Sequence, residues 1–296
     1  MAGTHQVENG VLVFRPAFPF SPGLTVRAVF RATPAASPVE TSFAIPRPEL
    51  RSTTRVVNVY PSADTVPSNQ LKFYLQFSAA MERGRAWSHL TLLNGKGERV
   101  ELPFLEIDEE LWDREQKRLT VLFDPGRIKR GLLPLEEVGP AIVEGETYTL
   151  VIAQRWADAQ GNPLVSEFRK QFRVAAAERK PVDPLEWRIQ PPTPGTREPF
   201  RVVFPAPLDY ALLQRLLAVE FGGATVLGSI GLANQEREWL FTPHEPWIAG
   251  DYALRIDTAL EDLAGNRIGR AFDVDEFDPV TKQVQRVTTS IRFRIE

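Results

Sequence analysis

The chain has 296 residues, of which 43% are hydrophobic and 25% charged; these values are ordinary for a globular protein and exclude a disordered chain. Its 35 basic and 38 acidic side chains form no long block of one sign, so wholesale binding to nucleic acid or to an anionic membrane is not expected. Cysteine is absent, which excludes disulfides, thiolate metal sites and cysteine catalysis.

The first ten residues, MAGTHQVENG, contain neither a basic region nor an apolar region, so they do not form a signal peptide. No later stretch approaches the roughly 18 apolar residues that a membrane-spanning helix needs. We therefore expect no transmembrane segment in this chain.

One pattern then occurs three times, within residues 11–30, 119–152 and 238–256. Each copy is a strand that ends in aromatic-x-Pro, followed by a loop, a glycine and a second strand. The proline ends the first strand because it cannot donate to a β-ladder, and the glycine permits a tight turn. Seven positions separate proline from glycine in the first and third copies, but the middle copy has thirteen more residues in this loop.

The second strand of the pattern alternates between apolar and other residues. Tyr148, Leu150 and Ile152 share one face in the middle copy, and Tyr252, Leu254 and Ile256 share one face in the third. Period-two alternation predicts half-buried strands.

The middle and third copies also share their beginnings and ends. Residues 56–81 and 187–208 each contain a strand, a proline-rich turn and a strand ending in Phe. The motif Asp-x-x-Gly-Asn, at Asp158–Asn162 and Asp262–Asn266, predicts a turn in which Gly adopts positive φ. A final strand follows each turn. The first copy has only the second half of this plan.

Residues 55–174, with YPSADTVPSNQLKFYLQFSAAM, LTVLFDP, GETYTLVI and DAQGNPL, resemble the bacterial Ig-like domain of S-layer and other cell-envelope proteins. Residues 185–295 resemble it more loosely, and residues 11–46 only in its second half. The resemblance implies an antiparallel β-sandwich in a secreted or surface-exposed protein, often in tandem arrays. It brings no catalytic residues.

We accordingly predict an all-β protein of tandem antiparallel Ig-like β-sandwich domains. Residues 1–48 form a partial repeat, residues 49–178 a complete domain with a loop insertion near 131–143, and residues 184–296 a second complete domain. The half repeat leads us to expect a gene product that starts upstream, with an export signal or a lipid anchor; a misassigned start would look the same. Its strand edges would be unpaired unless it packs on the middle domain.

The loop LFDPGRIKRG at 122–131 has the glycine spacing of a phosphate-binding P-loop, but Leu132 and Leu133 replace the required Lys and Ser/Thr. We interpret it as an inter-strand loop with a basic patch. Arg127, Lys129 and Arg130 are candidates for contact with an acidic partner or a polysaccharide, and the insertion after them is either a binding loop or a cap on the core.

Six tryptophans offer aromatic surface. Trp187 and Trp239 lie in predicted strands and are assigned to the core, which is the usual place of large aromatic residues in sandwiches. Trp112, Trp156 and Trp247 lie at predicted loop edges, and they are the candidates for a platform on which sugar rings stack.

Two acidic stretches are candidates for calcium, which prefers several oxygen ligands. In residues 273–278, DVDEFD, the carboxylates of Asp273, Asp275 and Asp278 could share a cation, although a charged hairpin loop explains the stretch equally well. Residues 106–116, EIDEELWDREQ, lack EF-hand spacing and are interpreted as a solvated, partly helical loop.

No motif predicts catalysis. The three histidines lie far apart, and neither HExxH nor GxSxG occurs. The leading hypothesis is a non-catalytic module of the cell envelope that acts as a spacer or binds an envelope protein or polysaccharide, without a cofactor other than possible calcium. The alternatives are a carbohydrate- or matrix-binding adhesin and, less favoured, the accessory domains of an enzyme.

Overall fold

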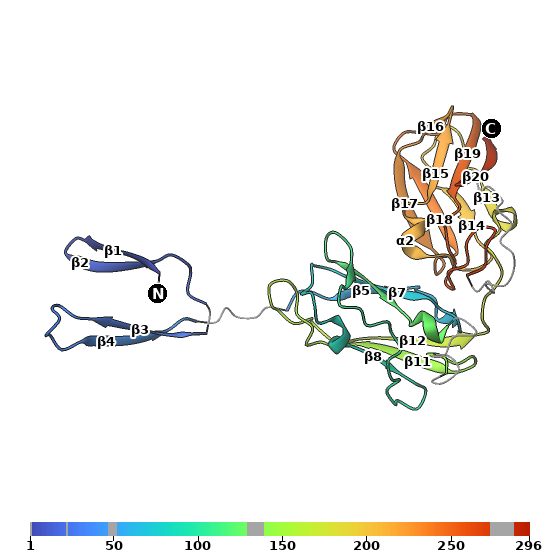
Figure 1. Cartoon of the computed structure of the whole chain (residues 1–296). Coiled ribbons are helices and arrows are strands. Elements are labelled where there is room, and N and C mark those ends of the chain that lie inside the picture. The colour runs from blue at the N-terminus through green and yellow to red at the C-terminus, as the bar shows by residue number, and fades with distance from the viewer. Residues whose placement is uncertain (1, 22, 47–51, 129–138, 273–286) are drawn as a thin grey trace. The chain divides into compact units, whose positions relative to one another are not determined.

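A computed structural model describes residues 2–21, 23–46, 52–128, 139–272 and 287–296. The chain divides into two compact units, Met1–Arg51 and Ser52–Glu296. Strands make up nearly all of the regular structure in the described residues, and they pair into several antiparallel sheets (Figure 1). The prediction of an all-β sandwich fold is confirmed. No helix within the described residues is long and apolar enough to cross a membrane.

The first unit consists of two antiparallel hairpins. One pairs β1 (Gly3–Glu8) with β2 (Val11–Pro16), and the other pairs β3 (Thr25–Phe30) with β4 (Val39–Ala44). None of the described residues of this unit is buried, although both hairpins carry apolar side chains.

The second unit begins with the middle sandwich, which has two four-stranded sheets. The first sheet has the order β5 (Val56–Tyr60), β7 (Lys72–Phe77), β10 (Arg118–Leu122) and β9 (Leu111–Trp112). The second has the order β6 (Thr65–Pro67), β12 (Phe168–Ala175), β11 (Thr147–Ile152) and β8 (Leu90–Leu93). All pairs are antiparallel except β6 with β12.

The C-terminal sandwich follows and also has two four-stranded sheets. The first has the order β13 (Arg188–Gln190), β14 (Phe200–Val203), β18 (Glu238–Pro243) and β17 (Gly228–Ala233). The second has the order β16 (Ala224–Thr225), β15 (Leu217–Phe221), β19 (Gly250–Asp257) and β20 (Thr288–Ile295). The short helix α2 (Tyr210–Leu213) connects the two sheets between β14 and β15. Short 3-10 helices span Ala86–His89, Pro125–Arg127 and Pro184–Glu186.

Each sandwich encloses its own apolar core between its two sheets. The predicted alternation is confirmed for Tyr252, Leu254 and Ile256, which are buried between less buried neighbours; on β11 Leu150 and Ile152 are fully buried, but Val151 between them is buried as well. Aromatic rings bridge the sheets: the Phe73 and Phe172 centroids lie 5.4 Å apart in the middle sandwich. Phe200 stacks on Phe293 at 4.2 Å in the C-terminal one. Burial of such rings is the main favourable contribution to the folding of each sandwich.

The two Asp-x-x-Gly-Asn turns form as predicted. The Asp158 Oδ1 atom accepts hydrogen bonds from the backbone amides of Gln160 and Asn162, at 3.0 and 2.9 Å. The amide of Asn266 donates in the same way to Asp262 Oδ1, at 2.9 Å. The glycines of both turns have positive φ, +85° and +83°, which the missing Cβ permits.

Candidate functional site at the junction of the two complete sandwiches

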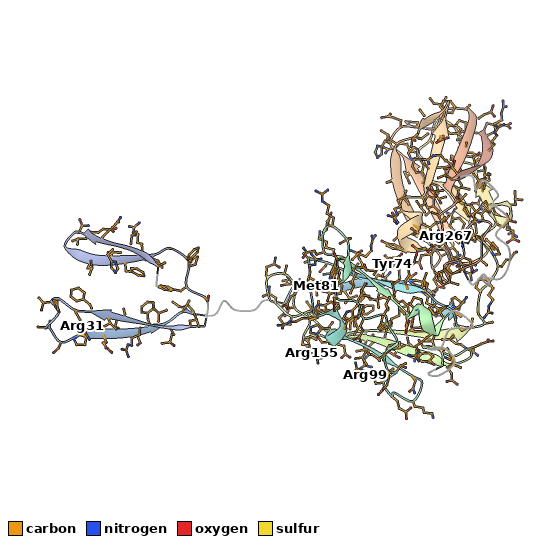
Figure 2. The ribbon with its side chains drawn as sticks, in the orientation of Figure 1. Arg31, Tyr74, Met81, Arg99, Arg155 and Arg267 are labelled. Carbon is orange, nitrogen blue, oxygen red and sulfur yellow. The ribbon has the colours of Figure 1, made fainter. Side chains whose placement is uncertain are left out.

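Buried and partly buried polar side chains contact one another where the middle and C-terminal sandwiches meet. We call this set the junction. Its members are Tyr60, Ser62, Lys72 and Tyr74 of the middle sandwich, and Asp209, Tyr210, Glu236 and Glu261 of the C-terminal sandwich. Tyr74 and Arg267, from the two sandwiches, are labelled in Figure 2.

Lys72 is the centre of a chain of alternating charges. Its Nζ atom lies 2.9 Å from Asp209 Oδ2 and 2.8 Å from Glu261 Oε2. Glu261 in turn accepts from the Arg267 guanidinium at 3.0 Å. The Lys72 side chain is only 13% exposed and that of Asp209 only 2%. Solvent therefore screens this network much less than it screens surface ion pairs.

Asp209 links the junction to the local structure of its own sandwich. Its Oδ1 atom accepts from the amide of Leu212 at 2.9 Å and so caps the N-terminus of α2. The same carboxylate accepts from the Tyr74 hydroxyl at 2.8 Å. One side chain thus satisfies a helix end and two groups from the other sandwich.

A second contact forms between a tight turn of the C-terminal sandwich and the loop after β5. The Glu236 carboxylate accepts from both the amide and the hydroxyl of Ser62, each at 2.7 Å. Lys170, on β12, donates to the carbonyl oxygen of Ser62 at 3.1 Å. Burial raises the pKa of Glu236, although the bonds from Ser62 oppose this shift. Burial lowers the pKa of Lys170, while the charges of Asp64 and Glu236 oppose that shift.

Aromatic packing completes this side of the junction. The rings of Tyr60 and Tyr210 stack with centroids 3.5 Å apart and planes inclined by 10°. Burial is the main cause that raises the pKa of Tyr210, to about 12. This hydroxyl therefore stays protonated at neutral pH.

Backbone contacts add to the side-chain network. The amide of Leu71 donates to the carbonyl of Leu263 at 2.9 Å. The segment between the sandwiches is held from both sides, because the Glu178 carbonyl accepts from the side-chain amides of Asn69 and Asn266, at 2.6 and 3.1 Å. Gly265 lies directly under Leu71, where an added Cβ would come within 2.8 Å of the leucine side chain.

The electrostatics of the junction fit a structural role. Burial alone would lower the pKa of Lys72, but the Asp209 charge, followed by Tyr74 and Glu261, outweighs burial and raises it. Burial and the Asp209 charge also raise the pKa of Tyr74. Both groups therefore remain protonated and bound to carboxylates at neutral pH, and neither is available as a general base.

One feature of the sequence points to this site, namely large residues at outward-facing positions of strand β7. On β7, Phe73, Leu75 and Phe77 face the core, which places Lys72 and Tyr74 on the outer face. Tyr74 is nevertheless only 6% exposed. The register sets it opposite Tyr60, so two tyrosines lie side by side on an outward face. Such a pair indicates that another surface covers the sheet.

Of the predicted basic patch, Arg127 has an internal role. It is only 8% exposed, and its guanidinium donates to four backbone carbonyls, those of Glu101, Leu102, Gly139 and Pro140, at 2.8–3.1 Å. It ties two loops together and is not free to contact a partner. Lys129 and Arg130 lie outside the described residues, so their proposed contact with an acidic partner stays a prediction.

The predicted sugar-stacking platform is wrong for two of its three tryptophans. Trp156 is fully buried and Trp247 is 3% exposed, because both complete apolar cores. Trp112 is half-buried against the middle core, and its indole N–H donates to Glu110 at 2.7 Å. A stacking platform needs an open ring face, so these residues give the adhesin hypothesis no support. Trp187 and Trp239 are buried as predicted.

The acidic candidates also have definite places. Residues 106–116 are not helical, since they contain the short strand β9, and Glu110 is buried, where it accepts from the amide of Ala86 at 2.6 Å. Asp273, Asp275 and Asp278 lie outside the described residues, so the calcium hypothesis there stays a prediction. Within the described ranges no three acidic, histidine or cysteine side chains are grouped to hold a metal.

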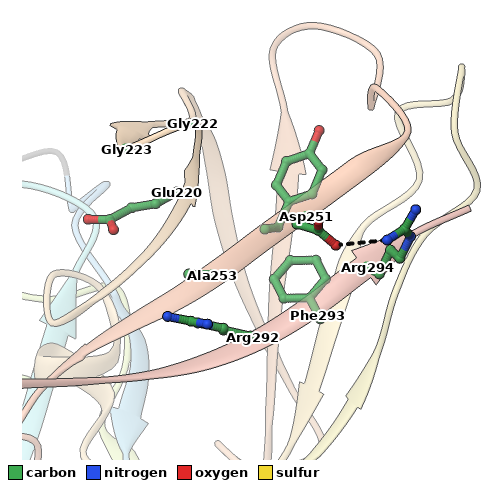
Figure 3. A pocket seen from close by; sticks show the side chains of 9 residues that line it. Glu220, Gly222, Gly223, Asp251, Ala253, Arg292, Phe293 and Arg294 are labelled. Atoms are coloured by element: carbon green, nitrogen blue, oxygen red, sulfur yellow. Dashed lines mark hydrogen bonds and ion pairs between the residues drawn. The ribbon is translucent and has the colours of Figure 1, made fainter.

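A shallow hollow of about 670 Å³ lies on the outer face of the β15–β19–β20 sheet (Figure 3). Its floor is Ala253, and its walls include Glu220 and Arg292. Asp251 and Arg294 pair across its rim at 3.5 Å, both of them well exposed. These side chains are ordinary solvated surface charges, and they do not form a set of converging catalytic groups.

Fold and junction together define an all-β protein in which two consecutive β-sandwiches share a buried polar contact. No known family and no curated protein matches the chain. Among solved structures it is similar to native alpha-2-macroglobulin from Escherichia coli spanning domains MG0-NIE-MG1, at 10% identity, over 82% of this chain and 71% of that chain, with a TM-score of 0.27. It is also similar to domains 4–9 of the surface layer protein SbsC, at 10% identity, over 98% of this chain and 37% of that chain, with a TM-score of 0.24. Likenesses of this extent carry no information about function.

Proposed function

We propose that this chain is a non-catalytic spacer of the bacterial cell envelope, in which the junction holds two β-sandwiches as one stiff rod segment. The observation that carries the proposal is the buried network around Lys72, Tyr74 and Asp209. Domains joined only by a linker reorient freely by default, unless a large or specific interface holds them. Here charges, hydrogen bonds and stacked rings from both domains satisfy one another.

The cellular location in this proposal follows from the sequence resemblance to envelope Ig-like domains. An extracellular or envelope protein that spaces other molecules needs length and stiffness more than a reactive site. The polar groups buried at the junction are saturated by one another, which favours a mechanical task. Its partners would be proteins or polysaccharides of the envelope.

Single-molecule energy transfer tests the stiffness directly. Because the native chain has no cysteine, the exposed positions Lys96 and Glu245 can be changed to cysteine and labelled, one in each sandwich. We expect a single narrow distribution of transfer efficiency. The double variant Lys72→Met, Tyr74→Phe should broaden it, because it removes the groups from the middle sandwich that bind Asp209.

The matched control is Lys117→Met, which removes a lysine whose exposed ion pair with Glu115 involves no member of the junction. This control should leave the distribution narrow. A broad distribution in the otherwise unaltered chain, or equal broadening by the control, would contradict the proposal.

A further inference from the structure

The two hairpins of the first unit share specific contacts with hairpins of the complete sandwiches. In the β1–β2 hairpin, Gly3 lies opposite Pro16 and packs under the Phe14 ring; in the β17–β18 hairpin, Gly228 lies opposite Pro243 and packs under the Phe241 ring. These two hairpins are therefore structural equivalents.

The second hairpin of the unit has an equivalent in the middle sandwich. The amide of Gly23 donates to the carbonyl of Ile45, and the amide of Ile45 donates to that of Leu24. The same two bonds occur where β11 meets β12: the amide of Gly145 donates to the carbonyl of Val174, and the amide of Val174 donates to that of Glu146. The β3–β4 hairpin therefore corresponds to β11–β12, and hence to β19–β20.

The complete sandwiches show what normally covers the free edges of these hairpins. In the C-terminal sandwich β14 pairs with the far edge of β18, and β15 pairs with the far edge of β19. The matching edges of β2 and β3 have no strand partner among the described residues. An open edge of this kind is a template for another chain.

The face that should form a core is open as well. Leu12 is 49% exposed, Phe30 49% and Phe43 43%. Phe43 lies opposite Val26 on β3, and its ring is 6.0 Å from that of Phe20 in the segment between the two hairpins. Monomeric proteins seldom expose so many apolar side chains together, and such surfaces mark interaction sites.

We propose that the first unit pairs with the first unit of a second copy of this chain to form one shared sandwich. In this arrangement β2 pairs with its counterpart about a two-fold axis, and β3 does the same in the other sheet. The result is two four-stranded sheets, the same number of strands per sheet as in both complete sandwiches.

Strand direction and charge both favour this occupant. All pairs in the C-terminal sandwich are antiparallel, and a two-fold axis perpendicular to the sheets produces antiparallel pairs at both new seams. Each edge strand carries one charged residue, and each is already neutralised within its hairpin: Arg15 pairs with Glu8 at 2.7 Å, and Arg27 with Glu40 at 3.3 Å. Two copies therefore meet without opposed unpaired charges.

Light scattering coupled to size-exclusion chromatography tests this with the full chain. We expect a mass of twice the 33.3 kDa of one chain, falling toward one chain on dilution. The variant Phe43→Lys places a charge in the shared core and should give a monomer. Leu12→Pro should do the same through the backbone, because it removes an amide on an edge strand that must pair.

Val29→Lys is the matched control. Val29 is 48% exposed and lies on the opposite face of β3, across from Glu40, so the same new charge should leave the dimer intact. Circular dichroism checks that the second unit stays folded in every variant. A monomer in the unaltered chain at every concentration would overturn the proposal, as would a dimer that neither Phe43→Lys nor Leu12→Pro weakens.

Discussion

At the scale of the residue, the junction depends on a few buried polar atoms whose partners come from another domain. Removing one member of a buried charge network leaves the others unpaired, which typically costs about 3–5 kcal/mol. Removing a neutral hydroxyl leaves a smaller deficit, roughly 1–3 kcal/mol. The order of these costs distinguishes a network centred on Lys72 from one centred on Tyr74.

We therefore expect Lys72→Met to lower the free energy of unfolding by about 3–5 kcal/mol, since Asp209 and Glu261 lose their shared cation. Tyr74→Phe should lower it by roughly 1–3 kcal/mol. Urea unfolding followed by tryptophan fluorescence measures both. Lys117→Met, at an exposed ion pair, should cost less than about 1 kcal/mol. Equal effects of Lys72→Met and Lys117→Met would show that the junction network contributes nothing specific.

The same turn motif gives its two aspartates opposite acidities. At Asp158, burial raises the pKa, but hydrogen bonds from Asn162, Thr54 and Gln160 outweigh it and lower the pKa below its ordinary value. At Asp262, which follows the junction residue Glu261 in the chain, burial dominates over similar bonds and raises the pKa to about 6. The nearby Glu178 charge adds to the increase.

A pH dependence follows from Asp262. Because its folded-state pKa lies above that of the unfolded chain, the folded state binds this proton more tightly. The contribution is fully present below about pH 4 and is lost as the pH rises through about 6. Carbon-detected NMR of the carboxyl groups should show Asp262 titrating near pH 6 and Asp158 below its usual range. Titration of both aspartates at one common pH would refute this account.

At the scale of the element, the close packing of β17 against β18 depends on the missing side chain of Gly228. A Cβ added at Gly228 would overlap the Thr242 carbonyl and the Phe241 ring. Gly231, three residues later on the same strand, would place its Cβ no closer than 3.7 Å to Leu240, which is an ordinary contact. The two glycines provide a matched pair with different steric surroundings.

Gly228→Ala should consequently destabilise the C-terminal sandwich by about 1–3 kcal/mol, as overpacking of a close-packed core typically does. Gly231→Ala should be tolerated. Differential scanning calorimetry of the two variants measures the shift in Tm. A larger loss at Gly231 than at Gly228 would mean that Phe241 does not pack against β17 as described.

At the scale of the whole molecule, the period-two pattern predicted the strands well, because each strand depends on the alternation of apolar and polar residues within its own short segment. Tyr252, Leu254 and Ile256 are buried as their spacing predicted, and both Asp-x-x-Gly-Asn turns form. Trp156 and Trp247 lie at the edges of predicted loops, and the sequence alone does not show that a core closes over them.

The contacts of the junction could not be predicted from the sequence, for a different reason. Its contacts join residues from separate repeats, such as Tyr74 with Asp209, and each partner resembles a surface residue within its own repeat. Only the placement of one sandwich against the other makes these groups buried. Periodicity describes one element at a time and carries no information on which outward face is covered.

The junction contacts also have a consequence for the time course of folding. They join residues separated by 135, 174 and 189 positions, so we expect them to form only after both sandwiches are largely built. Interactions that form after the transition state leave the folding rate unchanged and slow unfolding instead. The junction around Lys72 is therefore expected to slow unfolding and so to lengthen the lifetime of the folded chain. Slow unfolding is most useful to a protein that must stay folded for a long time.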